Sequence, residues 1–298
     1  MFVNDTSSYY IKGDPSLFYE TTICECLSSL ESPYMETLTC KKTFGQFISE
    51  IITGNFKKSD VNIIVECGGG YGNLMSDVIP ALKPSKVYMV DISKKLLKIQ
   101  QKTLKKFKNV EFVNYDIFDF LKNFPYHIDI FICNEVIGDL KTVVNLNKKN
   151  FNNEYNIDIS YLPEIFNLNI GAIELIKYLK NKITLAFISE HSSTYQIPCD
   201  YSGLYLKDEK KNLSPKRIQL KGHDEYTVNF RMLEEVAQNM GFKTVKKSFM
   251  DFLPLRKDKL INFILTSHSH QTEFHEIVYE FYNHVKEYEY LLMEMNSA

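Results

Sequence analysis

Apolar positions in the middle of the chain follow two alternating patterns. Short and almost uninterrupted apolar runs predict buried strands, at 62–65, 86–90, 110–113, 128–133 and 183–188. Between these runs, apolar residues recur at intervals of three and four, which predicts helices, at 74–82, 94–107 and 162–179. Strands that alternate with helices form a parallel sheet with right-handed crossovers, covered on both faces. The pattern therefore predicts an α/β fold.

The N-terminal part has helical spacing without strands. Apolar residues at 17–30 and 43–52 predict two helices around a turn at Ser32-Pro33. We therefore expect residues 1–60 to form a helical N-terminal extension or lid.

Two polar stretches and a varied C-terminal part complete the pattern. The stretches near 142–160 and 197–229 are expected to be loop-like insertions above the open end of the sheet. A helix is predicted at 230–240, where Gly241 is a good C-terminal cap. We also expect an antiparallel pair of strands at 244–252 and 260–267. A C-terminal helix is predicted over 268–298, with an apolar stripe from Phe274 to Met295. Such a stripe usually packs on its own domain, and a homodimer contact is the alternative.

Composition narrows the class of protein. The 35 basic and 37 acidic side chains of the 298 residues nearly cancel, so no general attraction for nucleic acid is expected. No apolar segment approaches the roughly 20 residues that span a bilayer, so we expect no membrane partner. The six cysteines contain no CxxC pair, and the N-terminus has no basic region followed by an apolar stretch. These features favour a reduced, cytoplasmic protein.

A cluster of glycines follows the first predicted strand. The segment from Glu66 to Gly72 reads E-C-G-G-G-Y-G, with glycines at Gly68, Gly70 and Gly72 that would let a ligand lie against the backbone. A dinucleotide site requires G-x-G-x-x-G, but the third position is Asn73 or Met75 here. The spacing E-x-G-x-G-x-G resembles motif I of class I S-adenosylmethionine (SAM) dependent methyltransferases. That resemblance implies SAM as cofactor, with Glu66 near its methionine end.

The ends of the next two strands offer further cofactor contacts. Asp91, followed by Ile92, ends the second strand, and its carboxylate can accept both hydroxyls of a ribose. NAD sites share this feature. Asp116 and Ile117 look like the family's adenine-binding segment, in which an acid meets the exocyclic amine and an apolar neighbour packs on the ring. The resemblance implies a seven-stranded, Rossmann-like SAM-binding domain over 61–267.

The end of the fourth strand carries the catalytic candidates. In the methyltransferase family this position borders the transferring methyl group, and it reads Asn134-Glu135 in this chain. Asn134 is expected to contact the cofactor. A carboxylate at Glu135 would orient a cationic or amine nucleophile and help to remove its proton. Asp139 is the second candidate. We therefore predict transfer of a methyl group to a nitrogen or oxygen nucleophile.

Several segments also resemble the MidA-type methyltransferases, a group that includes a complex I assembly factor that methylates an arginine. Over roughly residues 30–255 the similar segments are Asn134–Leu140, Glu36–Thr39 with Phe44-Gly45, and Gly222–Phe230. The chain departs from that pattern at 40–42 and at Asn229. The resemblance implies substrate-covering insertions and a protein or peptide arginine as acceptor. A small-molecule acceptor (a natural product or metabolite) is the alternative.

Other functions agree with fewer of the motifs described above. An oxidoreductase disagrees with the glycine spacing, and an aminopropyltransferase would favour aspartates where Asn134-Glu135 stands. A non-catalytic assembly or interaction protein with the same fold stays open. His191 and His223 are alternative bases on loops. Three further histidines could be considered as metal ligands, namely His268, His270 and His275. Their spacing matches no tetrahedral site, so we expect no metal.

Overall fold

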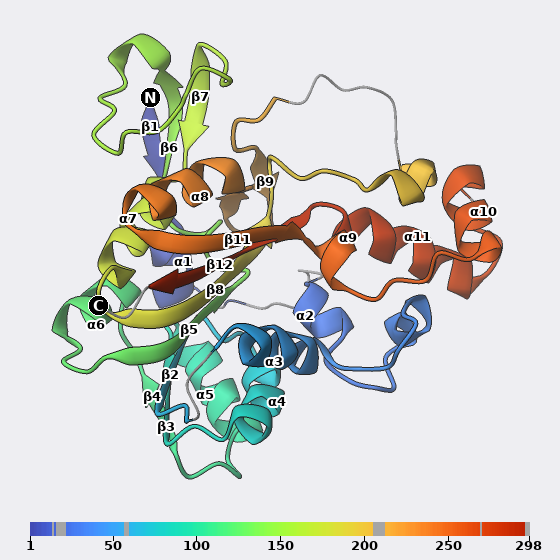
Figure 1. Cartoon of the computed structure of the whole chain (residues 1–298), viewed down its shortest axis with the longest axis horizontal. Helices are drawn as coiled ribbons and strands as arrows, with labels where there is room; N and C mark the ends of the chain where they lie inside the picture. The colour runs from blue at the N-terminus through green and yellow to red at the C-terminus, as the bar shows by residue number, and fades with distance from the viewer. Residues whose placement is uncertain (14, 16–21, 57–59, 205–211, 269, 296–298) are drawn as a thin grey trace.

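The computed structural model describes residues 1–13, 15, 22–56, 60–204, 212–268 and 270–295. Its centre is a seven-stranded sheet with the order β11-β12-β8-β5-β2-β3-β4 (Figure 1). The strands are β2 (Ile63–Cys67), β3 (Lys86–Val90), β4 (Val110–Val113), β5 (Ile128–Asn134), β8 (Ile183–His191), β11 (Phe242–Ser248) and β12 (Tyr288–Met295). The strands β2, β3, β4, β5 and β8 pair in parallel, and β12 is antiparallel to both of its neighbours. The predicted α/β fold with a seven-stranded sheet is confirmed.

Helices cover both faces of this sheet, because successive side chains of a buried strand point to opposite sides. Ile130 and Ile132 of β5 belong to the apolar core beneath the first group of helices, and Phe131 and Cys133 belong to the core on the other face. The first group is α3 (Phe44–Asn55), α4 (Asn73–Leu82) and α5 (Lys94–Thr103). The second group is α6 (Ile117–Asn123), α7 (Ile170–Leu179) and α8 (Phe230–Asn239).

The N-terminal part contains short helical pieces. These are α1 (Ser7–Lys12), α2 (Ile23–Cys26) and the 3-10 helix η2 (Pro33–Thr37), which precede α3. Residues 17–21 of the helix predicted at 17–30 lie outside the described residues, and the described remainder forms only α2 and a turn. The helix predicted at 43–52 is confirmed as α3, whose N-terminus has a capping box between Thr43 and Gln46.

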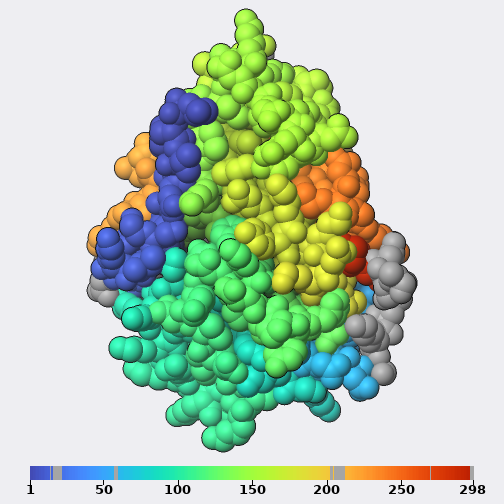
Figure 2. Space-filling model, turned by 90° about the vertical axis from the view of Figure 1, so that its left-hand side faces the viewer, coloured from blue at the N-terminus to red at the C-terminus, as the bar shows by residue number. Residues whose placement is uncertain are grey.

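The insertion near 142–160 contains structure that the sequence pattern did not predict. Strand β6 (Thr142–Asn147) pairs with β1 (Phe2–Asn4) and with β7 (Ile165–Leu168), and the short η3 (Lys148–Asn150) follows β6. The prediction of a loop at 142–160 was therefore wrong for its first part. The helix predicted at 162–179 begins only at Ile170, as α7, because β7 comes before it. Buried residues alternate with more exposed ones along β6, but its asparagines, and the lysines on either side of it, are typical of a loop. In the space-filling view the blue N-terminal segment lies beside this green region (Figure 2).

The second insertion contains the 3-10 helix η4 (Cys199–Leu204) and a small hairpin of β9 (Arg217–Gln219) and β10 (Asp224–Tyr226). Residues 205–211 of this insertion lie outside the described residues. No helix in the described part of the chain is long and apolar enough to cross a bilayer.

Two C-terminal expectations were wrong. Residues predicted to form a strand at 260–267 lie in helix α10 (Lys259–Ser267), which follows the short α9 (Phe249–Phe252). The predicted C-terminal helix over 268–298 ends early, because α11 (Glu273–Val285) gives way to β12. The apolar run of β12 is buried on both faces between β8 and β11, and it continues the spacing of the helix in front of it. The strand that pairs with β11 is thus β12.

Candidate active site

A cavity of about 700 Å³ lies at the carboxyl ends of the parallel strands. Every sequence-predicted site residue except Gly72 lines it. The lining residues from that set are Glu66, Gly68, Gly70, Asp91, Ile92, Asp116, Ile117, Asn134, Glu135 and Asp139. The β-strand ends thus meet at one edge of the sheet, as the topology requires.

The glycine loop follows β2 and forms the floor of this cavity. Gly68 has a φ of +64°, and a Cβ there would lie 2.5 Å from Cγ2 of Val136. Gly70 also has a positive φ and lines the cavity. Gly72 is the N-cap of α4, with a φ of +84°, and does not line the cavity, so its contact with the cofactor stays a prediction.

Glu66 lies beneath this loop with almost no exposure to solvent. Burial, with the charge of Asp91 as the second cause, raises the pKa of Glu66 to about 8. Within the described residues, its Oε2 atom has no hydrogen-bond partner. A buried carboxylate oxygen without a donor is costly, so it is suited to a polar or cationic ligand group.

Asp91 is buried at the end of β3 and is firmly held. Its carboxylate accepts hydrogen bonds from the Ser93 N–H and from Gln100 Nε2, both at 2.8 Å. Gln100 also donates to the carbonyl of Gly70 at 3.2 Å, which ties the glycine loop to Asp91. Burial raises the pKa of Asp91 to about 6. The ribose contact assigned to Asp91 stays a prediction.

Asp116 follows β4 and caps helix α6. Its Oδ1 accepts from the Phe118 N–H at 2.8 Å. Ile117 beside it is buried and lines the same part of the cavity. The position suits an acid with an apolar neighbour, and their contact with adenine stays a prediction.

Glu135 stands at the end of β5 in the left-handed region, with a φ of +55°. Its carboxylate accepts from three donors, the Cys24 N–H at 3.3 Å, Asn134 Nδ2 at 3.1 Å and the Tyr288 hydroxyl at 3.0 Å. Burial, and then the charge of Glu190, raises its pKa to about 8. Asn134 also accepts from Ser189 Oγ, which holds its amide beside Glu135, and its contact with the cofactor stays a prediction.

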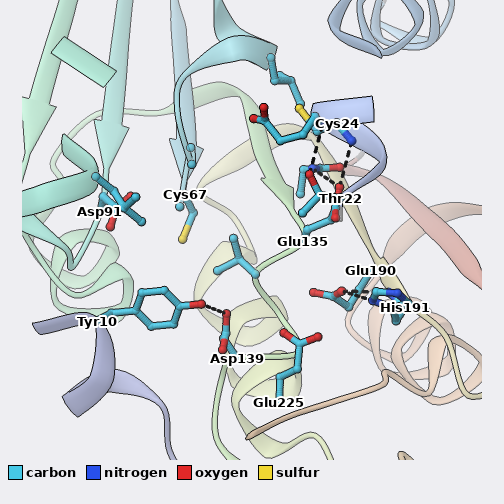
Figure 3. A pocket seen from close by; sticks show the side chains of 18 of the residues that line it. Tyr10, Thr22, Cys24, Cys67, Asp91, Glu135, Asp139, Glu190, His191 and Glu225 are labelled. Carbon is cyan, nitrogen blue, oxygen red and sulfur yellow. Dashed lines mark hydrogen bonds and ion pairs between the residues drawn. The ribbon is translucent and has the colours of Figure 1, made fainter. Parts of the chain in front are cut away.

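Glu190, which sequence reasoning did not select, lies beside Glu135 (Figure 3). It accepts from the Gly138 N–H at 3.1 Å and the His191 N–H at 2.9 Å. A Cβ at Gly138 would lie 3.2 Å from its carboxyl carbon, so the glycine permits this approach. Burial raises the pKa of Glu190 to about 8. The sequence could have identified Glu190 by its position at the end of a predicted strand, because Glu66, Asp91 and Glu135 have the same position.

The two histidines considered as bases occupy different places. Burial lowers the pKa of His191 to about 4, so it is neutral near pH 7, and its ring packs 4.1 Å from that of Tyr288. His223 is on the β9–β10 hairpin, and its Nε2 lies 3.4 Å from Oδ1 of Asp139. Asp139 also accepts from the Tyr10 hydroxyl at 2.8 Å (Figure 3). Sequence reasoning missed Tyr10 and Tyr288.

The charge of the cavity wall is one-sided. Among the described lining residues there is no lysine or arginine. Besides Glu66, Asp91 and Asp116, the acidic lining side chains are Glu25, Glu135, Asp139, Glu190, Glu225 and Glu280. A wall with this many carboxyl groups favours a cationic ligand, because a cation lowers the cost of ionising neighbouring carboxyl groups.

Comparisons with known proteins agree with this architecture. Residues 45–154 match a family model described as "Putative S-adenosyl-L-methionine-dependent methyltransferase". A search of curated protein sequences found no match.

Two solved structures from Burkholderia thailandensis have a similar fold. An uncharacterized COG1565 superfamily protein has a TM-score of 0.57 at 14% identity, over 98% of this chain and 87% of that one. A member of the same superfamily bound to S-adenosylhomocysteine has a TM-score of 0.54 at 13% identity, over 92% of this chain and 79% of that one. The MidA-type resemblance is consistent with this superfamily.

Proposed function

We propose that this chain, a class I SAM-dependent methyltransferase by its family match and its fold, transfers the methyl group of SAM to a cationic nitrogen acceptor. The proposal of a cationic acceptor rests on the acidic wall of the cavity, where no lysine or arginine is found among the described lining residues. A guanidinium or a protonated amine fits such a wall, whereas a phosphate or carboxylate would be repelled.

The residues around the glycine loop fit SAM. The buried Glu66 Oε2 atom has no hydrogen-bond partner among the described residues and suits the ammonium group of a methionine moiety. Asp91 lines the cavity and would bind the ribose, and Asp116 with Ile117 would bind the adenine. The sulfonium of SAM supplies an electrophilic methyl group. The cavity volume of about 700 Å³ leaves space for an acceptor beside the cofactor.

Glu135 would hold and deprotonate the acceptor nitrogen. In the transfer, the nitrogen lone pair forms the N–CH3 bond as the S–CH3 bond breaks, and the sulfur keeps that electron pair. The nitrogen must lose a proton, and the Glu135 carboxylate accepts it; for a protonated amine this loss precedes the transfer, because an ammonium nitrogen has no lone pair. A pKa near 8 suits this task, because such a carboxylate is a better base than an exposed one. Glu190 would supply a second negative charge next to the cationic acceptor.

The same chemistry and the MidA-type resemblance support one class of acceptor above the others. The planar guanidinium of a protein or peptide arginine can pair with two carboxylates at once, which matches the neighbouring Glu135 and Glu190. We therefore place a protein or peptide arginine first. A small cationic metabolite is the second candidate, since the same two carboxylates would bind an amine.

The test is a methyl-transfer assay with isotopically labelled SAM. Purified protein is given arginine peptides, lysine peptides and small guanidines, each paired with a neutral analogue of the same shape. We expect label in the guanidinium or amine compounds only, and Glu135→Gln should remove it. Preferential labelling of hydroxyl or carboxylate acceptors would contradict the proposal.

A further inference from the structure

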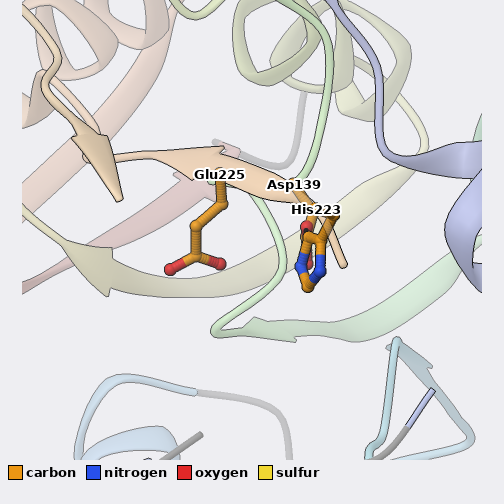
Figure 4. Close-up of side chains that lie close together, drawn as sticks. All are labelled: Asp139, His223 and Glu225. Atoms are coloured by element: carbon orange, nitrogen blue, oxygen red, sulfur yellow. Dashed lines mark ion pairs between the residues drawn. The ribbon is translucent and has the colours of Figure 1, made fainter. Parts of the chain in front are cut away.

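Three side chains that take no part in the proposed transfer step lie close together, and two of them belong to the acidic wall of the cavity. They are Asp139 from the loop after β5, and His223 and Glu225 from the β9–β10 hairpin. Their ligand atoms all lie within 4.8 Å of one another. Figure 4 shows the side chains of His223 and Glu225 pointing to the same side of the hairpin, with Asp139 next to the imidazole.

The donor set has the chemistry of a divalent metal site. It offers one imidazole nitrogen and two carboxylates, which together match the charge of a divalent ion. In a tetrahedral zinc site with zinc–ligand bonds of about 2.1 Å, two ligand atoms lie about 3.4 Å apart. The measured distance between Asp139 Oδ1 and His223 Nε2 is 3.4 Å. Glu225 would move inward by roughly 1 Å, which rotation about its flexible side chain allows.

Neighbouring aromatic residues hold two of the three groups in place. The Tyr10 hydroxyl donates to Oδ2 of Asp139 at 2.8 Å and lies 3.4 Å from Nε2 of His223. The ring of Tyr9 stacks on that of His223 at 4.3 Å, and the His223 side chain is only 4% exposed. The hydrogen bond to Asp139 Oδ2 and the stacking of Tyr9 would fix the orientation of these two ligands, and the ion would take the place of Tyr10 at Nε2 of His223.

The inner oxygen of Asp139 is an independent sign of a ligand. This atom, Oδ1, is buried and accepts no hydrogen bond within the described residues, although it faces the other two groups. Tyr10 satisfies only the outer oxygen. A buried carboxylate oxygen without a hydrogen-bond donor is costly, and a bound metal ion would satisfy it.

We propose that Asp139, His223 and Glu225 bind one divalent first-row transition-metal ion, such as Zn²⁺. Asp139 and Glu225 line the cavity, so the open coordination positions of the ion would face it. The ion would also join the β9–β10 hairpin to the loop after β5. Because it neutralises Asp139 and Glu225, the acceptor would keep Glu135 and Glu190 as its carboxylates.

The direct test is titration of the chelator-treated full chain with Zn²⁺ by calorimetry, and with Co²⁺ by visible absorption. We expect one equivalent of each to bind and a tetrahedral or five-coordinate cobalt spectrum. Mg²⁺ should give no heat, because an imidazole ligand favours transition metals. Absence of Zn²⁺ binding would overturn the proposal. A thiolate-to-cobalt absorption band would also overturn it, because it would place the ion on cysteine.

Matched variants locate the ion without an activity measurement. Asp139→Asn and Glu225→Gln should each weaken Zn²⁺ binding by at least about tenfold. Asp224→Asn is the control, since this neighbour pairs with Arg217 at 2.7 Å, and its affinity should stay unchanged. Zn²⁺ should raise the melting temperature of the wild type and the control only. Unchanged affinity in folded Asp139→Asn and Glu225→Gln proteins would overturn the assignment.

This inference goes beyond the proposed acceptor and does not depend on it. Metal binding is measured without SAM or an acceptor, so failure of one proposal leaves the other intact.

Discussion

The two sides of the cavity hold their acidic groups in different ways. On the side of the glycine loop, Asp91 and Asp116 accept hydrogen bonds from residues two to nine positions away. On the opposite side, Glu135 accepts from Tyr288, which is 153 positions away, and Asp139 accepts from Tyr10, which is 129 positions away. Figure 3 shows Asp91 separated from Glu135 and Glu190 across the cavity.

This difference suggests a division of labour. The side of the glycine loop, which we propose as the cofactor side, is shaped by local turns that form with the sheet. It should therefore keep its geometry when the opposite side, which we propose as the acceptor side, is altered. The acceptor side depends on segments from both ends of the chain. Its buried carboxylates also repel one another, so it should respond more strongly to pH.

The largest effect should come from the cofactor side. Gly70→Val places a branched side chain on the cavity floor at a positive φ, so we expect affinity for S-adenosylhomocysteine to fall at least about 100-fold. Calorimetry measures this, and circular dichroism checks the fold. Gly54→Ala is the control, because a Cβ at Gly54 meets nothing within 4 Å. Tight binding by folded Gly70→Val would show that the ligand lies elsewhere.

Glu135→Gln should separate the two sides of the cavity. The amide keeps the shape of the side chain but removes the base, so we expect kcat to fall about 100-fold. Affinity for S-adenosylhomocysteine should change less than about threefold, because Glu135 is across the cavity from Asp91. Steady-state kinetics and calorimetry measure the two effects. Equal losses in both would indicate that the sides are not independent.

Tyr288→Phe should shift the pH dependence of turnover. The Tyr288 hydroxyl donates to Glu135, which favours the ionised carboxylate and lowers its pKa. Without this donor, the pKa of Glu135 should rise further above about 8. The alkaline rise of kcat would then move upward by roughly half a unit to one unit. A pH–rate profile that stays in place would remove Glu135 from the titration.

Glu190→Gln should have the smallest effect, a change in stability. The folded-state pKa of Glu190 is raised from 4.5 to about 8, so the folded state holds a proton that the unfolded state loses above pH 4.5. The group therefore costs stability progressively as pH rises from about 4.5 to 8. We expect the variant to melt about 2–4 °C above the wild type at pH 8, and to match it at pH 5. An equal difference at both pH values would argue against a buried, protonated Glu190.

The sequence was sufficient to bring the acids at the strand ends together, and insufficient for the side chains that contact them from distant segments. Glu66, Asp91, Asp116 and Glu135 each end a strand that an apolar run predicts, and parallel strand ends must meet at one edge. Tyr10, Tyr288 and the β9–β10 hairpin reach the cavity only through long-range packing, and no local pattern encodes such contacts.

The C-terminal error has the same origin. The apolar residues of β12 continue a helical spacing, and only their place between β8 and β11 makes them a strand. Tertiary contacts therefore decided this element against its local pattern.

The most direct test of the acidic acceptor wall uses two small ligands of almost equal shape. Protein saturated with S-adenosylhomocysteine is titrated by calorimetry with methylguanidinium and with neutral methylurea between pH 6.5 and 9. We predict that methylguanidinium binds at least about tenfold more tightly, and that its affinity rises with pH as carboxyl groups with pKa values near 8 ionise. Equal affinity for both ligands, or tighter binding of methylurea, would contradict a cationic acceptor.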